Sequence, residues 1–166
     1  MTSNNPDAPM PALIGLGANI PSVAGPPAKT FNAALAMLGN TEVEITAVSP
    51  FYETEAWPDS AAPKFLNAVA AIRTRLQPVA LLTLLHELET AFGRKRSVPN
   101  AARSLDLDLL DYGGAVRDGP VTLPHPRVTQ RRFVLEPLKA VAPHWRHPVS
   151  GQDVDALLKE LAGRVP

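Results

Sequence analysis

The chain of 166 residues contains no cysteine. Disulfide bonds, thiolate metal sites and cysteine nucleophiles are therefore excluded. It also carries no surplus of either charge, because 16 Lys and Arg residues balance 16 Asp and Glu residues. The sequence pI is close to 6.9. A neutral chain of this kind does not suit a long polyanion, so we expect no nucleic-acid partner.

Long apolar segments are missing as well. No stretch approaches the roughly 18 apolar residues of a membrane span, so we expect no membrane partner. The N-terminal residues lack the basic and apolar regions of a signal peptide, and the absence of cysteine is compatible with a reducing compartment. We therefore expect a cytoplasmic protein. Its length suits one domain, and we expect a flexible tail at residues 1–11, a single domain at 12–166 and a monomer.

Proline is abundant, with 18 residues spread along the chain. These prolines and the glycines mark turns between periodic segments. The patterns predict strands at 12–16, 43–52, 65–76, 105–112 and 121–123, and helices at 29–38, 78–92, 133–141 and 154–161. Ser150 and Asp153 are candidate capping residues of the last helix. The first six long elements follow the order β-α-β-β-α-β, which is typical of an α+β, ferredoxin-like sandwich. We predict a mostly antiparallel sheet with helices packed on it.

The most informative stretch is Arg-Ser-Leu-Asp-Leu-Asp-Leu-Leu at residues 103–110. In a strand, the alternating leucines that begin at Leu105 would point into a core, and Asp106 and Asp108 would share the opposite face, roughly 6.6 Å apart. Carboxylates this close repel each other unless a cation holds them together. Mg²⁺ commonly takes one or two protein carboxylates together with substrate phosphates. The stretch therefore suggests a magnesium site.

Alternating acids alone are weak support, because half-exposed strands often place acids on their solvated face. The surrounding charges favour a site instead. Residues 93–103 contain four cationic side chains and no acid, and residues 119–135 contain three arginines, one histidine and no acid. Local positive segments in a neutral protein suggest a compact anionic ligand, such as the phosphates of a nucleotide.

The usual backbone motifs for phosphate are absent. Gly15-Leu-Gly17 lacks the third glycine of a dinucleotide fingerprint, since Ile20 stands at that position. Residues 25–30 end like a P-loop, but their spacing is wrong and their prolines lack N–H donors. Side-chain cations and metal would have to hold a nucleotide here. His86 has no second histidine at metal-ligand spacing, so we expect no zinc site.

Several segments taken together resemble the hydroxymethyldihydropterin pyrophosphokinase family of folate synthesis. They run from about residue 12 to residue 148 and include Gly17-Ala-Asn19, Ser49-Pro-Phe-Tyr-Glu-Thr54, Arg103-Ser-Leu-Asp106-Leu-Asp108, Leu123-Pro-His125-Pro-Arg127 and Arg131-Arg-Phe133-Val-Leu. The resemblance implies a ferredoxin-like fold. It also implies transfer of pyrophosphate from ATP to 6-hydroxymethyl-7,8-dihydropterin with two Mg²⁺ ions, giving AMP and the pterin diphosphate.

The resemblance also implies a role for individual residues. It makes Asp106 and Asp108 the metal ligands and, with Arg94 and Arg103, the catalytic group. It implies ATP contacts at His86, Glu89, Arg96, Leu109, Thr122, His125 and Arg131, and pterin contacts at Thr54, Phe65, Asn67 and Phe133. In that scheme Asn67 reads the polar edge of the pterin and Phe133 stacks on its ring. Without the resemblance, Phe65 and Phe133 would be interpreted as core aromatics.

The chain departs from the family pattern in the segment before Arg103. Relatives often carry Arg-Trp-Gly-Pro there, in a mobile loop that closes over both substrates, whereas this chain has Val98-Pro-Asn-Ala-Ala102. The resemblance therefore leaves open what covers the pterin, and Trp57 in another loop is one candidate. Two other classes of function stay open at this point. One is a non-catalytic ferredoxin-like module that binds nucleotide or RNA, which an aromatic content of 5% disfavours. The other is a two-metal nuclease.

Overall fold

A computed structural model describes residues 5–56, 58–95 and 101–164 of the chain. Its centre is a five-stranded sheet made of β1 (Met10–Ala18), β2 (Val43–Val48), β3 (Tyr52–Thr54), β4 (Phe65–Thr74) and β5 (Asp106–Tyr112). The order across the sheet is β2-β4-β1-β5, and β3 also pairs with β4. Neighbouring strands run antiparallel. The predicted α+β, ferredoxin-like architecture is confirmed.

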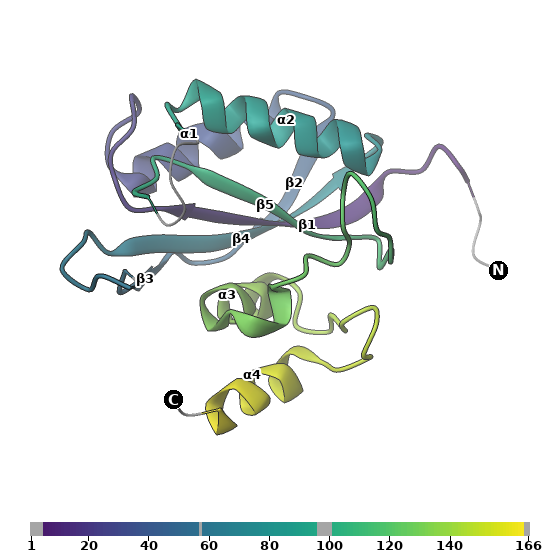
Figure 1. Cartoon of the computed structure of the whole chain (residues 1–166). Coiled ribbons are helices and arrows are strands. Elements are labelled where there is room, and N and C mark those ends of the chain that lie inside the picture. Colours follow the sequence, from purple (N-terminus) through teal and green to yellow (C-terminus); the bar gives the residue numbers. More distant parts are fainter. Residues whose placement is uncertain (1–4, 57, 96–100, 165–166) are drawn as a thin grey trace.

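Helices cover both faces of the sheet (Figure 1). One face carries α1 (Pro27–Gly39) and α2 (Pro78–Ala91), and the other carries α3 (Arg132–Val141), with α4 (Val154–Gly163) packed on the outer side of α3. A short 3₁₀-helix, Val128–Gln130, precedes α3. Each of α1 and α2 begins with proline, whose fixed φ suits the first helical turn. None of the helices in the described parts of the chain is long and apolar enough to cross a membrane.

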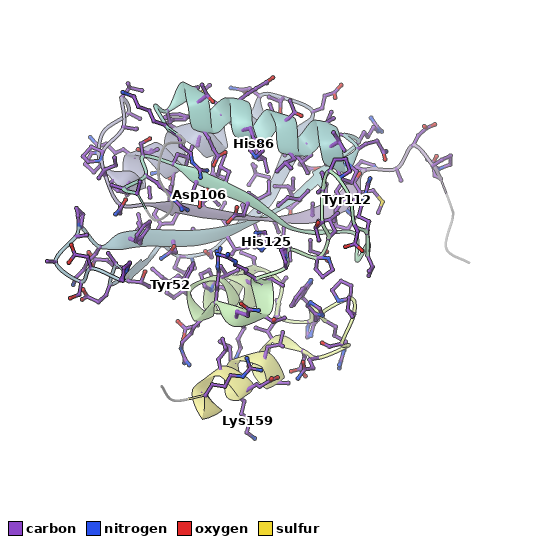
Figure 2. The ribbon with its side chains drawn as sticks, in the orientation of Figure 1. Tyr52, His86, Asp106, Tyr112, His125 and Lys159 are labelled. Atoms are coloured by element: carbon purple, nitrogen blue, oxygen red, sulfur yellow. The ribbon has the colours of Figure 1, made fainter. Side chains whose placement is uncertain are left out.

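The two faces of the sheet bury two separate apolar cores, so side chains fill both layers in Figure 2. Ile14 and Leu16 of β1 point toward α1 and α2, whereas Leu13 of the same strand points toward α3 and α4. This arrangement explains why the central strands read as almost continuous apolar runs, because they are buried on both faces.

Several element boundaries differ from the prediction, and three of these differences affect the sheet. The expected strand 43–52 is divided into β2 and β3. Pro50 has no N–H to donate to a ladder, and Ser49 exchanges hydrogen bonds with Val69 of β4 through both its backbone and its hydroxyl. β1 begins at Met10, inside the segment assigned to the tail. The expected strand at 121–123 is reduced to a single bridge between Arg117 and Leu123.

Of the two candidate capping residues of α4, Asp153 is the one that caps the helix. Its carboxylate accepts a hydrogen bond from the Ala156 amide at 2.8 Å, as an N-cap residue does. The hydroxyl of Ser150 instead accepts from the Gln152 amide at 3.3 Å, within the preceding turn.

Candidate active site

Asp106 and Asp108 lie on β5, which is the edge strand next to β1. Leu107 and Leu109 between and after them are buried in the core beneath α2, so the predicted alternation of faces is confirmed. The Asp106 side chain keeps 17% of its surface exposed and the Asp108 side chain keeps 32%. The pair is therefore held on a buried strand while its carboxylates remain reachable.

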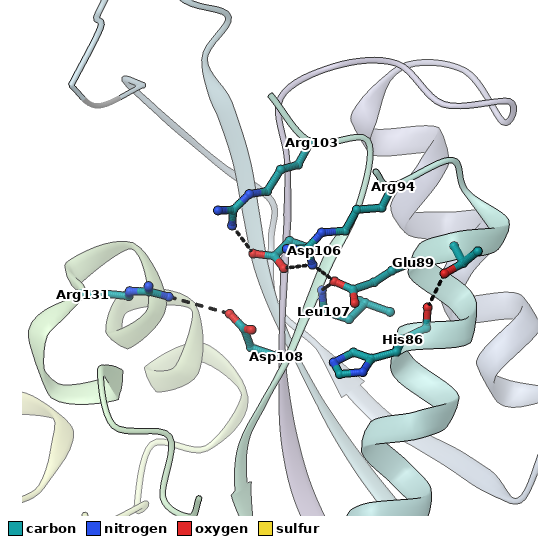
Figure 3. Close-up of polar contacts among 9 residues, drawn as sticks. His86, Glu89, Arg94, Arg103, Asp106, Leu107, Asp108 and Arg131 are labelled. Carbon is teal, nitrogen blue, oxygen red and sulfur yellow. Dashed lines mark hydrogen bonds and ion pairs between the residues drawn. The ribbon is translucent and has the colours of Figure 1, made fainter. Parts of the chain in front are cut away.

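Two guanidinium groups bind Asp106 (Figure 3). Arg94 donates from Nη1 to Oδ1 at 2.5 Å, and Arg103 donates from Nη1 to Oδ2 at 2.7 Å. Burial alone would raise the pKa of Asp106, but the charges of Arg94 and Arg103 hold it below its ordinary value. Asp106 is thus a carboxylate at neutral pH, with both oxygens facing cations.

Asp108 is less strongly paired. Among the residues that the structure describes, its cationic partner is Arg131, whose Nη1 lies 3.7 Å from Oδ2. Burial, followed by the negative charge of Asp106, raises the pKa of Asp108 to about 6. Arg131 also places its guanidinium over the Phe133 ring, 5.6 Å from the centroid. Arg131 therefore connects the carboxylate pair with the aromatic ring that was expected to stack on the pterin.

Glu89 reaches the site from α2 and is only 1% exposed. Its Oε2 accepts a hydrogen bond from the Leu107 amide at 3.1 Å and forms an ion pair with Arg94. Burial raises the pKa of Glu89 to about 7, despite the nearby charge of Arg94. Because Leu107 lies between the two aspartates, Glu89 fixes the backbone that carries both of them.

A cavity of about 280 Å³ opens beside the carboxylate pair. Its volume is close to the lower end of the roughly 300–1,000 Å³ that small-molecule sites occupy. Five of the seven residues expected to contact ATP line it: His86, Glu89, Leu109, Thr122 and His125. The predicted catalytic residues Arg94, Asp106 and Asp108 line it as well, together with apolar side chains and prolines. Figure 3 shows His86 directing its ring from α2 toward β5. Arg96 lies outside the described residues, as does most of the loop that was expected to close over the substrates.

His125 is anchored by its backbone, which donates to the Leu110 carbonyl of β5 at 2.9 Å. Its Nδ1 accepts a hydrogen bond from the Arg127 amide at 3.1 Å. Burial lowers the pKa of His125, and the charges of Arg131 and Arg127 lower it further. The imidazole is therefore neutral at pH 7, with its proton on Nε2, which makes it a donor for an anionic ligand.

The residues expected to bind the pterin gather outside this cavity, on the same face of the sheet as the aspartates. Asn67 donates from Nδ2 to the Thr54 hydroxyl at 2.8 Å, which fixes the orientation of its amide. Thr54 pairs with Phe65 across β3 and β4, so these two side chains lie beside each other. Phe133 stands at the start of α3 and is 39% exposed, so the structure does not bury it as a core aromatic.

The sheet register relates the two groups. Gly17 of β1 lies opposite Asn67 of β4 on one side and opposite Asp106 of β5 on the other. Directly paired residues of antiparallel strands point to the same face. Two interstrand spacings of about 4.8 Å place Asn67 and Asp106 roughly 10 Å apart. The Asn67 amide and the two aspartates thus lie on the same face of the sheet, with Gly17 between them.

Asn19 belongs to the site although it was not among the expected site residues. Its side-chain Oδ1 accepts a hydrogen bond from the Arg103 backbone amide at 2.7 Å, and its backbone amide donates to the Arg103 carbonyl at 3.0 Å. Its side-chain Nδ2 donates to the Pro63 carbonyl at 3.3 Å. Asn19 therefore holds the backbone of Arg103 next to the end of β1. The Gly-Ala-Asn motif was the sequence signal for it, but a role in holding another residue could not be deduced from the motif.

The donor chemistry of the site fits a hard divalent cation. Two carboxylates share one strand face, and the charge of Asp106 raises the pKa of Asp108, a repulsion that a cation would relieve. No group of three or more His, Cys, Asp or Glu residues suited to a metal occurs within the described residues. A cation here would take its remaining ligands from phosphate oxygens and water, as Mg²⁺ commonly does.

Comparison with known families and proteins gives a consistent result. Residues 13–143 match the model of the family described as 7,8-dihydro-6-hydroxymethylpterin-pyrophosphokinase. The 2-amino-4-hydroxy-6-hydroxymethyldihydropteridine pyrophosphokinase of Methylorubrum extorquens is 40% identical over 152 residues, covering 90% of this chain and 92% of that protein. The enzyme of the same name from Pseudomonas aeruginosa is 37% identical over 147 residues, covering 87% and 88%.

Longer proteins also contain a related segment. The folic acid synthesis protein fol1 of Schizosaccharomyces pombe is 36% identical over 152 residues, and the chain spans only 20% of its length. The crystal structure of Plasmodium falciparum HPPK-DHPS superposes with a TM-score of 0.72 at 13% identity, covering 98% of this chain and 42% of that one. At that identity the superposition supports the fold alone.

Proposed function

This chain belongs to the 7,8-dihydro-6-hydroxymethylpterin-pyrophosphokinase family, and we propose that it transfers pyrophosphate from ATP to 6-hydroxymethyl-7,8-dihydropterin in folate synthesis. The observation that carries the proposal is the row Asn67–Gly17–Asp106 on one face of the sheet. It puts an amide that can read a heterocycle beside a carboxylate pair with three arginines. The two half-sites that such a transfer needs therefore lie next to each other.

The proposed nucleotide site is the cavity beside β5. Asp106 and Asp108 would hold Mg²⁺ there, and the Asp108 carboxylate can take such a ligand because its ion pair with Arg131 is long, at 3.7 Å. When bound, Mg²⁺ supplies neutralisation of the phosphate charge and favours loss of the proton from the attacking hydroxyl. We propose two such ions, as in the family to which the chain belongs.

The arginines would change partners when ATP is bound. Arg94 and Arg103 pair with Asp106 in the structure, and Arg131 lies near Asp108. Phosphate oxygens are strong acceptors for guanidinium groups, so these side chains can turn from carboxylate to phosphate without losing a charged partner. His125 offers its Nε2 proton to the same anion. These donors would stabilise the charge that develops during transfer.

The reaction itself is an in-line substitution at the β-phosphorus of ATP. The hydroxymethyl oxygen forms a bond to that phosphorus, the bond from the phosphorus to the oxygen bridging to the α-phosphate breaks, and AMP leaves with the bridging oxygen. The hydroxyl proton is released to solvent. Positioning and charge stabilisation dominate this class of reaction, so it does not demand a covalent intermediate on the protein.

Pterin recognition is proposed for Asn67, Thr54, Phe65 and Phe133. The hydrogen bond from Asn67 Nδ2 to Thr54 leaves the Asn67 oxygen as the acceptor directed to a ligand. We propose that the enzyme acts as a monomer. We also place it in the cytoplasm, where ATP is available.

The decisive experiment measures AMP after MgATP and 6-hydroxymethyl-7,8-dihydropterin are mixed with the protein. We expect one AMP for each pterin diphosphate and none without pterin. Asp106→Asn should lower the rate about a thousandfold, equivalent to about 4 kcal/mol of transition-state stabilisation. Formation of ADP, release of nucleotides from nucleic acid, or nucleotide binding without turnover would each reject the proposal in favour of a different class of function.

A further inference from the structure

We propose that Gly17 is a specificity-determining position, whose missing side chain leaves the passage by which the hydroxymethyl arm of the pterin crosses β1 to reach the phosphate held at Asp106. The inference rests on the proposed function, because it takes the pterin to lie at Asn67 and the phosphates at Asp106. It assigns to this glycine a role in selecting the size of the transferring arm.

The register places Gly17 in the middle of the site. It pairs with Asn67 on β4 and with Asp106 on β5, and the side chains of a directly opposed row point to the same face. A Cβ atom at Gly17 would lie 3.6 Å from Asn67 Oδ1 and 3.9 Å from Asp106 Cβ. Any side chain here would therefore stand between the two half-sites.

The backbone does not require glycine at this position. Gly17 lies inside β1 and is not among the glycines with positive φ. The contacts of a Cβ atom would also be ordinary van der Waals contacts, so alanine fits the protein. Glycine inside a strand costs roughly 0.5–1 kcal/mol relative to alanine, and such a glycine often marks close approach of a ligand. The partly exposed surface of Gly17 supports this explanation.

Gly15 provides a contrast on the same strand and the same face. It is buried, and its Cβ would contact the Leu110 side chain at 3.5 Å in the core beneath α3. Packing against Leu110 is enough to account for Gly15. Gly15 lies opposite Val69 and Asp108, but the three atoms nearest to its Cβ would all belong to Leu110. The atoms nearest to a Cβ at Gly17 would instead belong to Asn67 and Asp106. Packing therefore explains the glycine at position 15, whereas access for a ligand explains the glycine at position 17. Replacement of each glycine by alanine can distinguish these two explanations.

The test compares Gly17→Ala and Gly17→Val with the matched control Gly15→Ala. For Gly17→Ala we expect native unfolding behaviour, and affinities for the pterin alone and for an unreactive MgATP analogue alone that stay within about threefold of the original. Turnover should fall at least tenfold, about 1.4 kcal/mol, and binding of the second ligand to the first complex should weaken by a similar factor. Gly17→Val should lose more, whereas Gly15→Ala should keep its turnover.

The outcomes separate the inference from the proposed function. If the unsubstituted protein forms no AMP, the proposed function fails. If it is active and Gly17→Ala keeps more than half of its turnover, the inference alone is wrong. A Gly17→Ala protein that loses affinity for one ligand by itself also refutes the inference, because the residue would then belong to one half-site. If Gly17→Val does not fold, Gly17→Ala decides the matter.

Discussion

Replacement of Glu89 by alanine should destabilise the fold more at pH 5 than at pH 8. Glu89 is almost completely buried, and its Oε2 is the acceptor for the Leu107 amide and a partner of Arg94. Loss of the carboxyl group leaves the buried Leu107 amide without that acceptor, which costs about 1–3 kcal/mol. Arg94 still pairs with Asp106 in the variant, so loss of its ion pair with Glu89 contributes less to the destabilisation.

The dependence on pH follows from the pKa of Glu89. Burial raises this pKa from 4.5 to about 7, so the folded state binds a proton more tightly than the unfolded state. The resulting stabilisation is fully present below pH 4.5 and is lost as the pH rises through 7. Between pH 5 and pH 8 the free energy of unfolding of the unsubstituted protein therefore falls by about 2.5 kcal/mol because of this group. The Glu89→Ala variant has no such carboxyl group, so its stability does not change with pH for this reason. The stability difference between the unsubstituted protein and the variant should therefore be about 2.5 kcal/mol larger at pH 5 than at pH 8.

Urea unfolding at both pH values measures the effect, and hydrogen exchange of the Leu107 amide reports the local contact. Glu89→Gln keeps an acceptor oxygen without a charge, so it should protect the Leu107 amide and be at least as stable as the original protein at pH 8. The control is Glu87→Ala on the same helix, where the side chain is exposed, which should change stability by less than about 0.5 kcal/mol at both pH values. Equal deficits of Glu89→Ala at pH 5 and pH 8 would refute the argument.

Three further predictions concern the ligands and the C-terminal helix. Asn67→Ala should weaken pterin binding by about 1–3 kcal/mol, because donors and acceptors of the pterin ring are left unpaired, and it should retain affinity for an unreactive ATP analogue. Calorimetry with each ligand measures both affinities. Equal losses for the two ligands would mean that Asn67 has only a structural role. The Asp108 carboxyl should titrate near pH 6 in carbon NMR of the metal-free protein, and Mg²⁺ with the ATP analogue should lower this midpoint; a midpoint near 4 without metal contradicts the proposed burial and repulsion. Asp153→Ala should cost about 1 kcal/mol of stability through loss of the helix cap, whereas Ser150→Ala should change little, and thermal unfolding that ranks the two variants the other way would reject the assignment of the cap.

The sequence predicted the elements whose periodicity is strong and local. The stripe of α2 and the alternation of β5 come from residues that are neighbours in the chain, and both were found where they were expected. The division of the predicted strand 43–52 was missed, because its cause lies in a contact between Ser49 and Val69 twenty residues away. The bulge of β5 beside Leu13 and Ile14 was missed for the same reason. Leu109 and Leu110 point to opposite cores by ordinary alternation, and the bulge after them returns Tyr112 to the same core as Leu109.

The site shows the same division between local pattern and tertiary contact. Asp106 and Asp108 could be paired from their spacing, and the cationic segments around them indicated an anion. The resemblance placed Glu89 among the ATP contacts, and Glu89 does line the cavity. Its carboxylate, however, is bound to Leu107 and Arg94. That arrangement depends on how α2 lies against the edge of β5, which no pattern within either segment specifies.

The register of three strands explains why the central relation of the site could not be derived from the sequence. Asn67 and Asp106 are far apart in the chain, and each belongs to a different apolar strand with its own alternation. Alternation determines which face a residue shares with its neighbours at i±2, but a shift of one residue in pairing would turn the whole strand over. Only the observed pairing of Gly17 with both strands brings the amide and the carboxylate to one face with an open glycine between them. The chemistry of each half-site is therefore local in the sequence, whereas their alignment for transfer is a property of the sheet.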